Sequence, residues 1–557
     1  ATVRIGGALG TGIGGQVTKD LAVAESIAVP LTMILLMVVF GSVVAALLPL
    51  SIAILAIFGT LAELNVLTHV TSVSIFAINL TTALGLGLGI DYALLMVSRF
   101  REELAGGAEV AEAVARTTAT AGRTIAFSAL TVAAALSAMI VFPVYFLKSF
   151  AYAGVGVTAF AAIGALIVMP ALLAVLGHRV NAGKIPGIKA VRDPETPFWN
   201  RLANGVMRRP IIAAAPVVLV LLFLATPLLK VTFAAPDDRA LPTSAASHQV
   251  GDALRNDFAT APSVTDVVIS PPLASAALST YESALSAVPG VQHVVDAGTV
   301  TGTQRLAITT GLYSTSSAAA TMVKQIRDVA VPAASQVLVG GDTAALIDGK
   351  YAISSSLLLA GGIIVATTFI LLFLFTGSIV QPVRALLGNA LTLGATLGAM
   401  VWIFQDGHFS KLLGFTPTPT NTSMPVLLFC IAFGLSMDYE VFLMSRIKEL
   451  HDGGATNADA VTHGLARTGR IVSTAAALLA ISFFAFATSK VSFIQFFGLG
   501  TGFAILIDAT LVRGVLVPAF MRVFGENSWY APAPLRKLHH RIGLSDAEPP
   551  ALELAGA

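Results

Sequence analysis

Gly85-Leu-Gly-Leu-Gly-Ile-Asp-Tyr-Ala-Leu-Leu-Met-Val-Ser-Arg99 is an apolar, glycine-rich stretch that carries one carboxylate, Asp91, in its interior. The same pattern returns far downstream in Gly434-Leu-Ser-Met-Asp-Tyr-Glu-Val-Phe-Leu-Met-Ser-Arg446, with Asp438 at the equivalent place. A single acid in an apolar helix has many explanations. Two acids at matching places predict that the chain contains two related halves and that the acids share one role.

The repeat extends beyond the two quoted stretches. At an offset of 347, residues 87–123 and 434–470 align without gaps and match at 16 of 37 positions. In both copies the acid is followed by a tyrosine, Tyr92 in the first and Tyr439 in the second. The duplicated Asp-Tyr pair is therefore the most specific feature of the sequence.

The composition indicates a membrane protein. Of the 557 residues, 55% are hydrophobic and 11% are charged, and the mean hydropathy is +0.83. Soluble domains contain about 25% charged residues, so most of this chain is not surrounded by water. The single cysteine, Cys430, lies in an apolar segment, which excludes an intrachain disulfide and a multi-cysteine metal site.

Apolar segments of about 20 residues, the length that crosses a bilayer, recur along the chain. They predict an α-helical polytopic membrane protein with eleven spans. The predicted spans are 26–47, 48–64, 78–98, 124–143, 150–176, 210–230, 353–375, 383–404, 424–445, 472–489 and 495–521.

Polar segments divide these spans into larger units. We predict that 1–25 is the end of a first external domain, 26–176 holds five first-half spans, 177–209 is a basic linker and 210–230 is the first span of the second half. Residues 231–352 are then a second external domain, 353–521 five further spans, and 522–557 a loosely ordered polar tail.

The linker fixes the expected orientation. Residues 177–209 contain seven Lys or Arg and two acids, a net charge of +5. By the positive-inside rule the linker lies in the cytoplasm. With eleven spans, the tail is also cytoplasmic, and 231–352 lies on the opposite, periplasmic side of the membrane.

The external segment has a periodicity of its own. Strand-like and helical patterns alternate at 263–269, 274–286, 291–296, 305–310, 316–329 and 336–340. The order βαββαβ is the split ferredoxin-like pattern. We therefore expect one folded α+β domain outside the membrane.

The two halves are unequal. The second half consists of one span, an external domain and five spans, whereas the first half shows only the end of an external domain and five spans. Val3-Arg-Ile-Gly-Gly7 is similar to Val337-Leu-Val-Gly-Gly341, which ends the second external domain. Symmetry predicts one more span and most of a first external domain, supplied upstream or by a separate polypeptide.

Asp91 lies about seven residues from the end of its predicted span, which at 1.5 Å per residue is roughly 10 Å inside the membrane. An acid in the bilayer costs about 2.5–3.5 kcal/mol to insert, so we expect it to face the protein interior and to have partners. Pseudo-symmetry predicts that Asp91 pairs with Tyr439. By the same symmetry, Asp438 pairs with Tyr92. Such an acid is a candidate proton relay, and the alternative is that the acids only join helices through hydrogen bonds.

Several other residues are candidates for the same region. Ser128 has a hydroxyl that could join the aspartates, although a bond to its own helix backbone is the simpler interpretation. Glu440 is present only in the second copy and is a possible relay or pore neighbour. Asp508 and Arg513 are predicted to form a structural ion pair near the cytoplasmic end of the last span, with Arg446 as another partner for Asp508.

Other chemistries leave no signature in the sequence. A G-x-x-x-x-G-K-[ST] motif is absent, so the chain has no P-loop for ATP. Metal-ligand spacing and a Ser-His-Asp arrangement are also absent. We therefore expect no enzyme, no cofactor or metal and no nucleic-acid partner. The proton gradient, worth about 2.3 kcal/mol per charge per 100 mV, is the expected energy source.

The chain resembles the MmpL family of the RND superfamily in four motifs: Gly89-Ile-Asp-Tyr92, Ala121-Gly-Arg-Thr124, Ser436-Met-Asp-Tyr439 and Asp508-Ala-Thr-Leu-Val-Arg513. The resemblance covers nearly the whole chain. It implies a pseudo-twofold transmembrane bundle, periplasmic porter domains and proton-driven export of lipids across the mycobacterial inner membrane. It also implies a proton relay made of both Asp-Tyr pairs, and it matches Ser128 to the family's inhibitor-contacting serine.

From these observations we predict a proton-driven exporter of lipids or glycolipids in the plasma membrane, or the larger part of a divided one. Its expected partners are the lipid substrate, protons, membrane lipids and a polypeptide that supplies the missing span. Two alternatives stay open. One is a non-transporting regulatory or residual membrane scaffold, similar to sterol-sensing proteins. The other is a SecDF-like translocation helper, which would carry protein.

Overall fold

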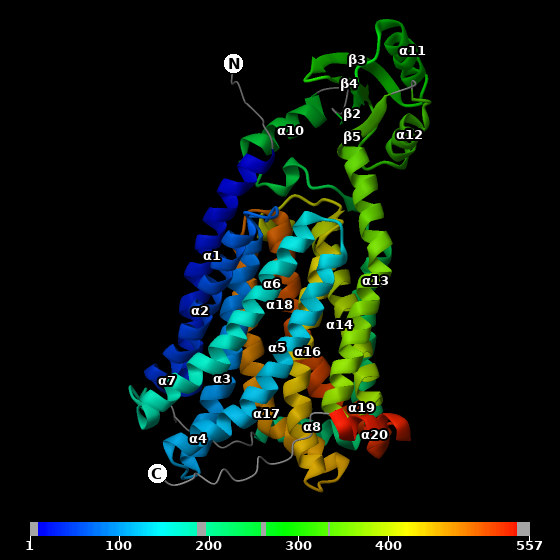
Figure 1. Cartoon of the computed structure of the whole chain (residues 1–557). Helices are drawn as coiled ribbons and strands as arrows, with labels where there is room; N and C mark the ends of the chain where they lie inside the picture. The colour runs from blue at the N-terminus through cyan, green and yellow to red at the C-terminus, as the bar shows by residue number, and fades with distance from the viewer. Residues whose placement is uncertain (1–8, 187–196, 258–262, 332–334, 543–557) are drawn as a thin grey trace.

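The computed structural model describes residues 9–186, 197–257, 263–331 and 335–542. Its helices form a bundle, and a small domain with a β-sheet stands beyond one end of that bundle (Figure 1). Within the described residues, eleven helical segments are long and apolar enough to cross a membrane. The predicted class, an α-helical multi-pass membrane protein with an external α+β domain, is confirmed.

Two groups of long helices make up the bundle. Those of the first half are α1 (Leu9–Phe40), α2 (Val43–Leu67), α3 (Ala77–Ala105), α5 (Arg123–Ser137) and α6 (Tyr145–Ile163). Those of the second half are α9 (Pro210–Ala225), α13 (Asp342–Thr376), α14 (Val380–Met400), α16 (Met424–Asp452), α17 (Asn457–Phe484) and α18 (Ser492–Ile507).

Shorter elements extend or connect the spans. The short α-helices are α4 (Val110–Thr117), α7 (Met169–Leu176), α8 (Pro197–Arg208), α15 (Ser410–Leu413), α19 (Val517–Phe524) and α20 (Ala533–Ile542). π-Helical turns occupy Thr118–Gly122, Gly164–Val168, Val401–Gln405 and Asp508–Leu516. The 3₁₀ turns are Ala138–Val141, Gly177–Asn181, Thr226–Lys230, Asp238–Ala240, Ala485–Thr488 and Gly525–Trp529.

The helices α3 and α16, which carry the duplicated Asp-Tyr pairs, form the centre of the bundle. In each of them 94% of the most apolar stretch is buried, against 6% in the peripheral α9 segment. Helix α5 of the first half packs against α16, and α17 of the second half packs against α3. This exchange of neighbours brings side chains of one half against the acid of the other.

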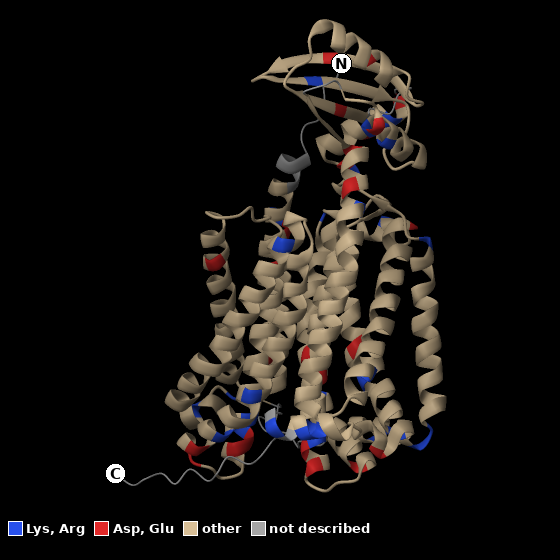
Figure 2. Cartoon of the chain, turned by 45° about the vertical axis from the view of Figure 1, so that its right-hand side comes forward, with Lys and Arg blue, Asp and Glu red and all other residues tan. Residues whose placement is uncertain are grey.

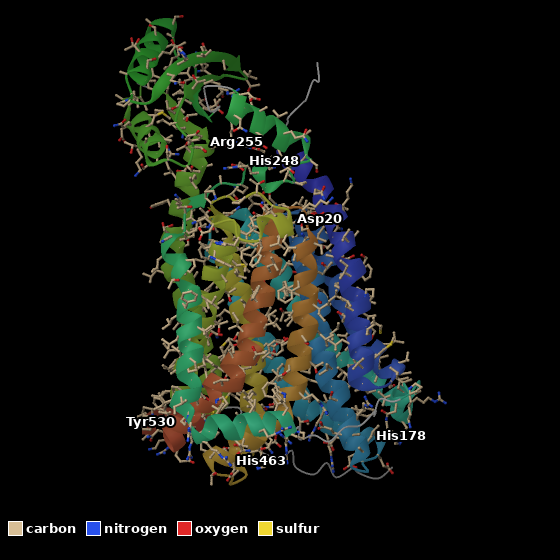
Figure 3. The ribbon with its side chains drawn as sticks, turned by 180° about the vertical axis from the view of Figure 1, so that it is seen from behind. Asp20, His178, His248, Arg255, His463 and Tyr530 are labelled. Atoms are coloured by element: carbon tan, nitrogen blue, oxygen red, sulfur yellow. The ribbon has the colours of Figure 1, made fainter. Side chains whose placement is uncertain are left out.

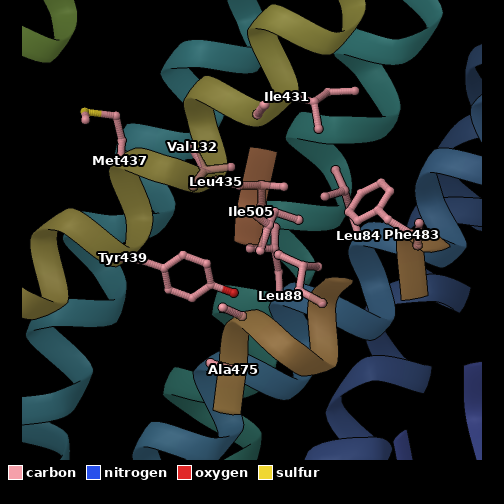
Figure 4. Close-up of a cluster of buried hydrophobic side chains, with 14 of the residues drawn as sticks. Leu84, Leu88, Val132, Ile431, Leu435, Met437, Tyr439, Ala475, Phe483 and Ile505 are labelled. Atoms are coloured by element: carbon pink, nitrogen blue, oxygen red, sulfur yellow. The ribbon is translucent and has the colours of Figure 1, made fainter. Parts of the chain in front are cut away.

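The centre is held by close packing of apolar side chains. Leu84 and Leu88 of α3, Leu435 of α16 and Phe483 of α17 meet in one buried cluster (Figure 4). At Gly89 an added Cβ would lie 2.6 Å from the Cα of Ala53 in α2, so only glycine allows this approach. Small residues at helix contacts are typical of membrane bundles, since lipid gives helices little hydrophobic reason to associate.

The external domain has the predicted ferredoxin-like order. Its strands are β2 (Ser263–Ser270), β3 (Val291–Val300), β4 (Thr303–Thr310) and β5 (Gln336–Gly341), and its helices are α11 (Ser275–Ser286) and α12 (Ser317–Asp328). The sheet order is β3-β4-β2-β5, and every neighbouring pair is antiparallel. Val267, Leu306 and Met322 belong to a hydrophobic core that is separate from that of the bundle.

Helix α13 joins this domain to the membrane. It begins directly after β5, where Gly341 has φ +107° and an added Cβ would lie 2.5 Å from the carbonyl oxygen of Val264. Ala344, in the first turn of α13, is part of the domain core. The same helix continues to Thr376, so one continuous helix links the domain core to the bundle.

A second route, the chain segment between α9 and β2, also connects the bundle to the external domain. It contains α10 (Ala246–Asp257) and the strand β1 (Phe233–Ala234), which pairs in parallel with β6 (Thr420–Asn421). His248 and Arg255 lie on this route near the external domain (Figure 3). Nearby, Asp20 of α1 accepts hydrogen bonds from Ser489 Oγ at 2.6 Å and the Lys490 amide at 2.8 Å. Helix α1 is thereby tied to the second half.

Charged side chains are sparse in the middle of the bundle and gather at the end opposite the external domain (Figure 2). His178, His463 and Tyr530 lie at that end as well (Figure 3). This distribution agrees with the prediction that this end faces the cytoplasm, and the orientation itself stays a prediction.

The first predicted boundaries are wrong. Helix α1 begins at Leu9 rather than at 26 and ends at Phe40, so most of the segment 1–25 is helical. Gly41 then turns the chain with φ +62°, a conformation that side chains other than glycine rarely adopt. Ser42 caps α2, and the predicted break at 47–48 lies inside α2. The motif Val3–Gly7 lies outside the described residues.

The segment after 522 is more ordered than predicted, at least up to residue 542. It completes α19, forms a 3₁₀ turn and adds α20. The indole nitrogen of Trp529 donates to Asn457 Oδ1 at 3.0 Å, and its ring stacks on His451 at 4.7 Å. These contacts anchor the segment to α16 and α17. Residues 543–557 lie outside the described part of the chain.

Candidate functional site

The two acids lie on the facing central helices, at equivalent places. Asp91 of α3 and Asp438 of α16 are each 1% exposed. Helices α3 and α16 are buried on nearly all sides, so a side chain in this part of either helix lies in the protein interior. Tyr439 points from α16 into the same apolar cluster (Figure 4).

Asp91 and Tyr439 form the predicted crossed pair. The Tyr439 hydroxyl donates a hydrogen bond to Asp91 Oδ2 at 2.5 Å. This contact joins the first half to the second half at the pseudo-twofold axis. Both side chains are buried, so the hydrogen bond is shielded from water.

The second crossed pair is indirect, which corrects the expectation of a Tyr92–Asp438 contact. Ser128 of α5 stands between them: its hydroxyl is hydrogen-bonded to Asp438 Oδ1 and lies 3.4 Å from the Tyr92 hydroxyl. A hydroxyl has one proton and two lone pairs, so Ser128 can donate to Asp438 while it accepts from Tyr92. The expectation that Ser128 bonds its own helix backbone is wrong, because α5 packs directly on α16.

One oxygen of each carboxyl has no hydrogen-bond partner among the described protein atoms. These oxygens are Asp91 Oδ1 and Asp438 Oδ2. Leaving a charged oxygen unpaired in an apolar core costs free energy, and protonation of the carboxyl removes that cost. Each acid therefore offers a defined position for a proton.

Asp508 and Arg513 form the predicted ion pair, with Arg513 Nε donating to Asp508 Oδ2 at 2.8 Å. They lie in a π-helical segment, Asp508–Leu516, whose wider turn brings residues five apart to one face. Arg446 is not the partner of Asp508, since it contacts Glu449 at 2.7 Å.

The location of this pair differs from the expected one. Arg513 is 2% exposed and donates from Nη2 to the Ser436 carbonyl at 2.5 Å. Its guanidinium carbon lies over the Tyr439 ring, 5.1 Å from the centroid. The pair thus belongs to the surroundings of the central tyrosine and is more than a structural contact at the helix end.

Glu440 has a partner that the sequence did not indicate. Its carboxylate forms a buried ion pair with Arg384 of α14. Arg384 Nε also donates to Gln381 Oε1 at 2.8 Å. Arg384 was not among the residues predicted from the sequence, although a basic residue inside an apolar span is itself a signal of a buried partner.

These pairings leave the two central acids without a cation in direct contact. Asp508 is neutralised by Arg513 and Glu440 by Arg384. Among the described residues, no Lys or Arg forms an ion pair with Asp91 or Asp438. Within the same residues, no group of three or more His, Cys, Asp or Glu side chains could hold a metal ion. The arrangement can hold protons at two buried carboxyls.

Comparison with known sequences assigns the family. The sequence profile of the MMPL family matches residues 1–213 and 227–545. The chain belongs to the MMPL family. This agrees with the resemblance of the four motifs, and relatives of the chain are named as exporters rather than as enzymes.

Relatives of this MMPL chain include three with substantial identity. The membrane protein SCO6666 of Streptomyces coelicolor is 40% identical over 544 residues, which is 97% of this chain and 75% of that protein. The trehalose monomycolate exporter MmpL3 of Mycolicibacterium smegmatis is 36% identical, with 96% of this chain and 57% of MmpL3 covered. The Mycobacterium tuberculosis MmpL3 is 34% identical, with 96% and 61% covered. This MMPL chain therefore spans about three-fifths of the MmpL3 exporters.

Solved structures share the architecture of this MMPL protein. SecDF aligns with a TM-score of 0.56 and 16% identity, covering 91% of this chain and 62% of SecDF. A heavy metal efflux pump aligns with a TM-score of 0.57 and 13% identity, covering 91% of this chain and 68% of the pump. At these identities the likeness shows the fold alone, which is the predicted RND-type pseudo-twofold bundle.

Proposed function

We propose that this MMPL protein is a proton-driven exporter of lipids or glycolipids, or the larger part of one. The observation that carries the proposal is the pair of buried, uncompensated acids, each hydrogen-bonded to a side chain from the other half. The cargo class is inferred from relatives that are named as lipid exporters.

The acids supply a physical link between proton binding and movement. A charged Asp91 accepts a hydrogen bond from Tyr439, whereas a protonated Asp91 can also donate one. Protonation of Asp438 likewise changes the group that accepts the hydrogen bond from the Ser128 hydroxyl. Because each contact joins the two halves, the preferred relative position of the halves depends on how many protons are bound.

Movement of the halves reaches the external domain through α13, which is continuous from the domain core to the bundle. Each proton that crosses the membrane provides about 2.3 kcal/mol per 100 mV. The relay residues in this proposal are Asp91, Tyr92, Ser128, Asp438 and Tyr439. The Asp508–Arg513 pair holds the ring of Tyr439 in place.

The membrane and sidedness belong to the same proposal. The basic linker is predicted to lie in the cytoplasm, so the external domain lies in the periplasm and the protein in the plasma membrane. A separate polypeptide that acts together with this chain is also part of the proposal.

The test is reconstitution of the protein, together with any co-purifying polypeptide, in liposomes that carry a pH gradient. Asp91→Asn and Asp438→Asn keep the size of each side chain and remove the titratable group. We expect both variants to lose proton-driven lipid export and proton flux. Asp406→Asn, an exposed acid in an external loop, is the matched control and should export normally. Export that survives both buried changes would contradict the proposal.

The same assay separates the two alternatives. A regulatory or residual scaffold conducts no protons and tolerates both substitutions. A SecDF-like helper conducts protons but holds no lipid cargo. Mass spectrometry of lipids that co-purify with the protein distinguishes this case from a lipid exporter.

A further inference from the structure

A cavity lies between the central helices at the end of the bundle opposite the external domain. Its volume is about 340 Å³, and it is lined by residues of α3, α5, α16 and α17 and of the adjoining π-helical turn. Ser98 and Arg99 of α3 line it together with Ser445 and Arg446, their counterparts in α16. The cavity therefore lies on the pseudo-twofold axis, directly in line with the two acids.

The cavity is suited to water. A water molecule needs a space of about 10–15 Å³ and two to four polar partners. Hydroxyl groups of Ser98, Ser445, Thr124 and Thr468 line the wall, and these side chains are only half-buried. The lining is mixed, with apolar side chains beside these hydroxyls and with Arg99, Arg446, Glu102 and Glu449 at the rim, so a space of this size has room and polar partners for water.

Only one helical turn separates this cavity from the acids. Leu95 and Phe442 line the cavity and follow Asp91 and Asp438 by four residues each. Four residues along a helix correspond to roughly 6 Å. Leu95 and Phe442 are thus apolar side chains between the hydroxyl-lined part of the cavity and the acids.

The other side of the acids is closed by aromatic rings. Phe146 and Phe150 of α6 match Phe493 and Phe497 of α18 at the same offset of 347. Phe76, before α3, joins the two pairs, with its ring centroid 5.0 Å from that of Phe493 and 6.0 Å from that of Phe146. The space that these rings line is only about 10 Å³, which leaves no room for a file of water.

We propose that this conformation exposes the relay to water only from the face opposite the external domain, with Leu95 and Phe442 as the barrier through which protons reach that water. The five phenylalanines form the closed gate on the other side. This proposal rests on the proposed proton relay. It adds the residues that decide from which side the acids exchange protons.

Thiol labelling tests the two sides without requiring transport. Replacing Cys430 by Ala gives a cysteine-free chain, into which single cysteines are placed at Ser98, Ser445 or Ala83. Ala83 is a buried residue of α3 between the aromatic rings and Asp91. Ser279→Cys, exposed on α11, is the control for sidedness. Vesicles of both orientations are treated with a membrane-impermeant maleimide.

We expect Ser98→Cys and Ser445→Cys to react only from the face opposite Ser279→Cys, and Ala83→Cys to react from neither face. Reaction of Ala83→Cys from the side of the external domain would overturn the closed gate. Protection of both cavity positions from both sides would overturn the water-filled cavity. Labelling is independent of proton coupling, so it separates a failure of this proposal from a failure of the relay.

Proton leak tests the barrier. In liposomes without cargo, Phe442→Ala and Leu95→Ala should each increase proton leak about tenfold, whereas Phe503→Ala, an exposed position on α18, should not. Adding Asp91→Asn and Asp438→Asn to Phe442→Ala should remove the increase. An unchanged leak in both barrier variants, or a leak that persists without the acids, would contradict the barrier role.

Discussion

Tyr439 of the second half donates a hydrogen bond to Asp91 of the first half at 2.5 Å, whereas Tyr92 reaches Asp438 only through Ser128. The two halves are related in sequence, yet the two Asp-Tyr contacts are built differently. The first is a direct bond between α3 and α16. The second adds α5, so it depends on three helices and on a hydroxyl that can reverse its direction of donation.

This asymmetry predicts unequal effects of removing the two tyrosine hydroxyls. Tyr439→Phe leaves both oxygens of Asp91 without a partner and should lower proton-driven transport by about tenfold or more, since a hydrogen bond to a charged group contributes about 1.5–3 kcal/mol. Tyr92→Phe leaves the Ser128–Asp438 bond in place and should lower it less than about threefold. Initial transport rates in liposomes measure both. Equal losses would show that the bridge through Ser128 is not the working contact.

The buried pair of Arg384 and Glu440 should matter for stability. Arg384→Met or Glu440→Gln alone leaves one partner unpaired in the bundle, which costs about 3–5 kcal/mol. The double variant should recover most of that loss. Thermal unfolding of the detergent-solubilised protein measures the effect, and Arg446→Met is the control because its contact with Glu449 is near the surface and is worth about 1 kcal/mol or less. A double variant no better than the singles would contradict the pairing.

Arg513 should not be replaceable by lysine. The guanidinium contacts Asp508, the Ser436 carbonyl and the Tyr439 ring at the same time. An ammonium keeps the charge but cannot make these planar contacts together. Arg513→Lys should therefore fold with near-normal thermal stability and lower the rate of proton-driven transport about tenfold. Normal transport by this variant would show that the charge alone suffices.

The segment before the external domain should lose stability in acid. Burial acts to raise the pKa of Asp238, but hydrogen bonds from Arg255 and its positive charge outweigh burial and hold that pKa below the usual value. A carboxyl whose pKa is lowered by folding stabilises the fold above its unfolded pKa of about 4, and this contribution is lost as the pH falls through the folded value.

The measurement is hydrogen exchange in α10, corrected for the intrinsic rate at each pH. Exchange should quicken below about pH 4 in the natural protein. Asp238→Asn, which has no carboxyl to titrate, should exchange faster at neutral pH and show little further change in acid. A natural protein whose α10 exchange does not depend on pH in this range would contradict the role of Asp238.

Much of this architecture follows from local sequence pattern. The number of spans was predicted from the length of the apolar segments, and the βαββαβ order from the alternation of strand-like and helical patterns. The Asp91–Tyr439 contact was predicted from the repeat that relates the two halves. The break between the first two spans was missed. That break depends on the positive φ of Gly41, and the hydropathy of the surrounding residues does not indicate a backbone angle.

The sequence by itself determined that two acid-bearing helices lie in a membrane and belong to related halves. Beyond the Asp91–Tyr439 contact, only the tertiary structure decided which side chains surround the acids. Ser128 bridges to Asp438, Arg513 covers Tyr439 and Arg384 neutralises Glu440, because α5, α14 and the π-helical turn after α18 all pack against one helix, α16. Such contacts join residues dozens to hundreds of positions apart, and the periodicity of a local sequence segment cannot predict them. They are set by packing around the axis, which also directs Arg513 and Arg384 to Asp508 and Glu440 rather than to Asp91 and Asp438.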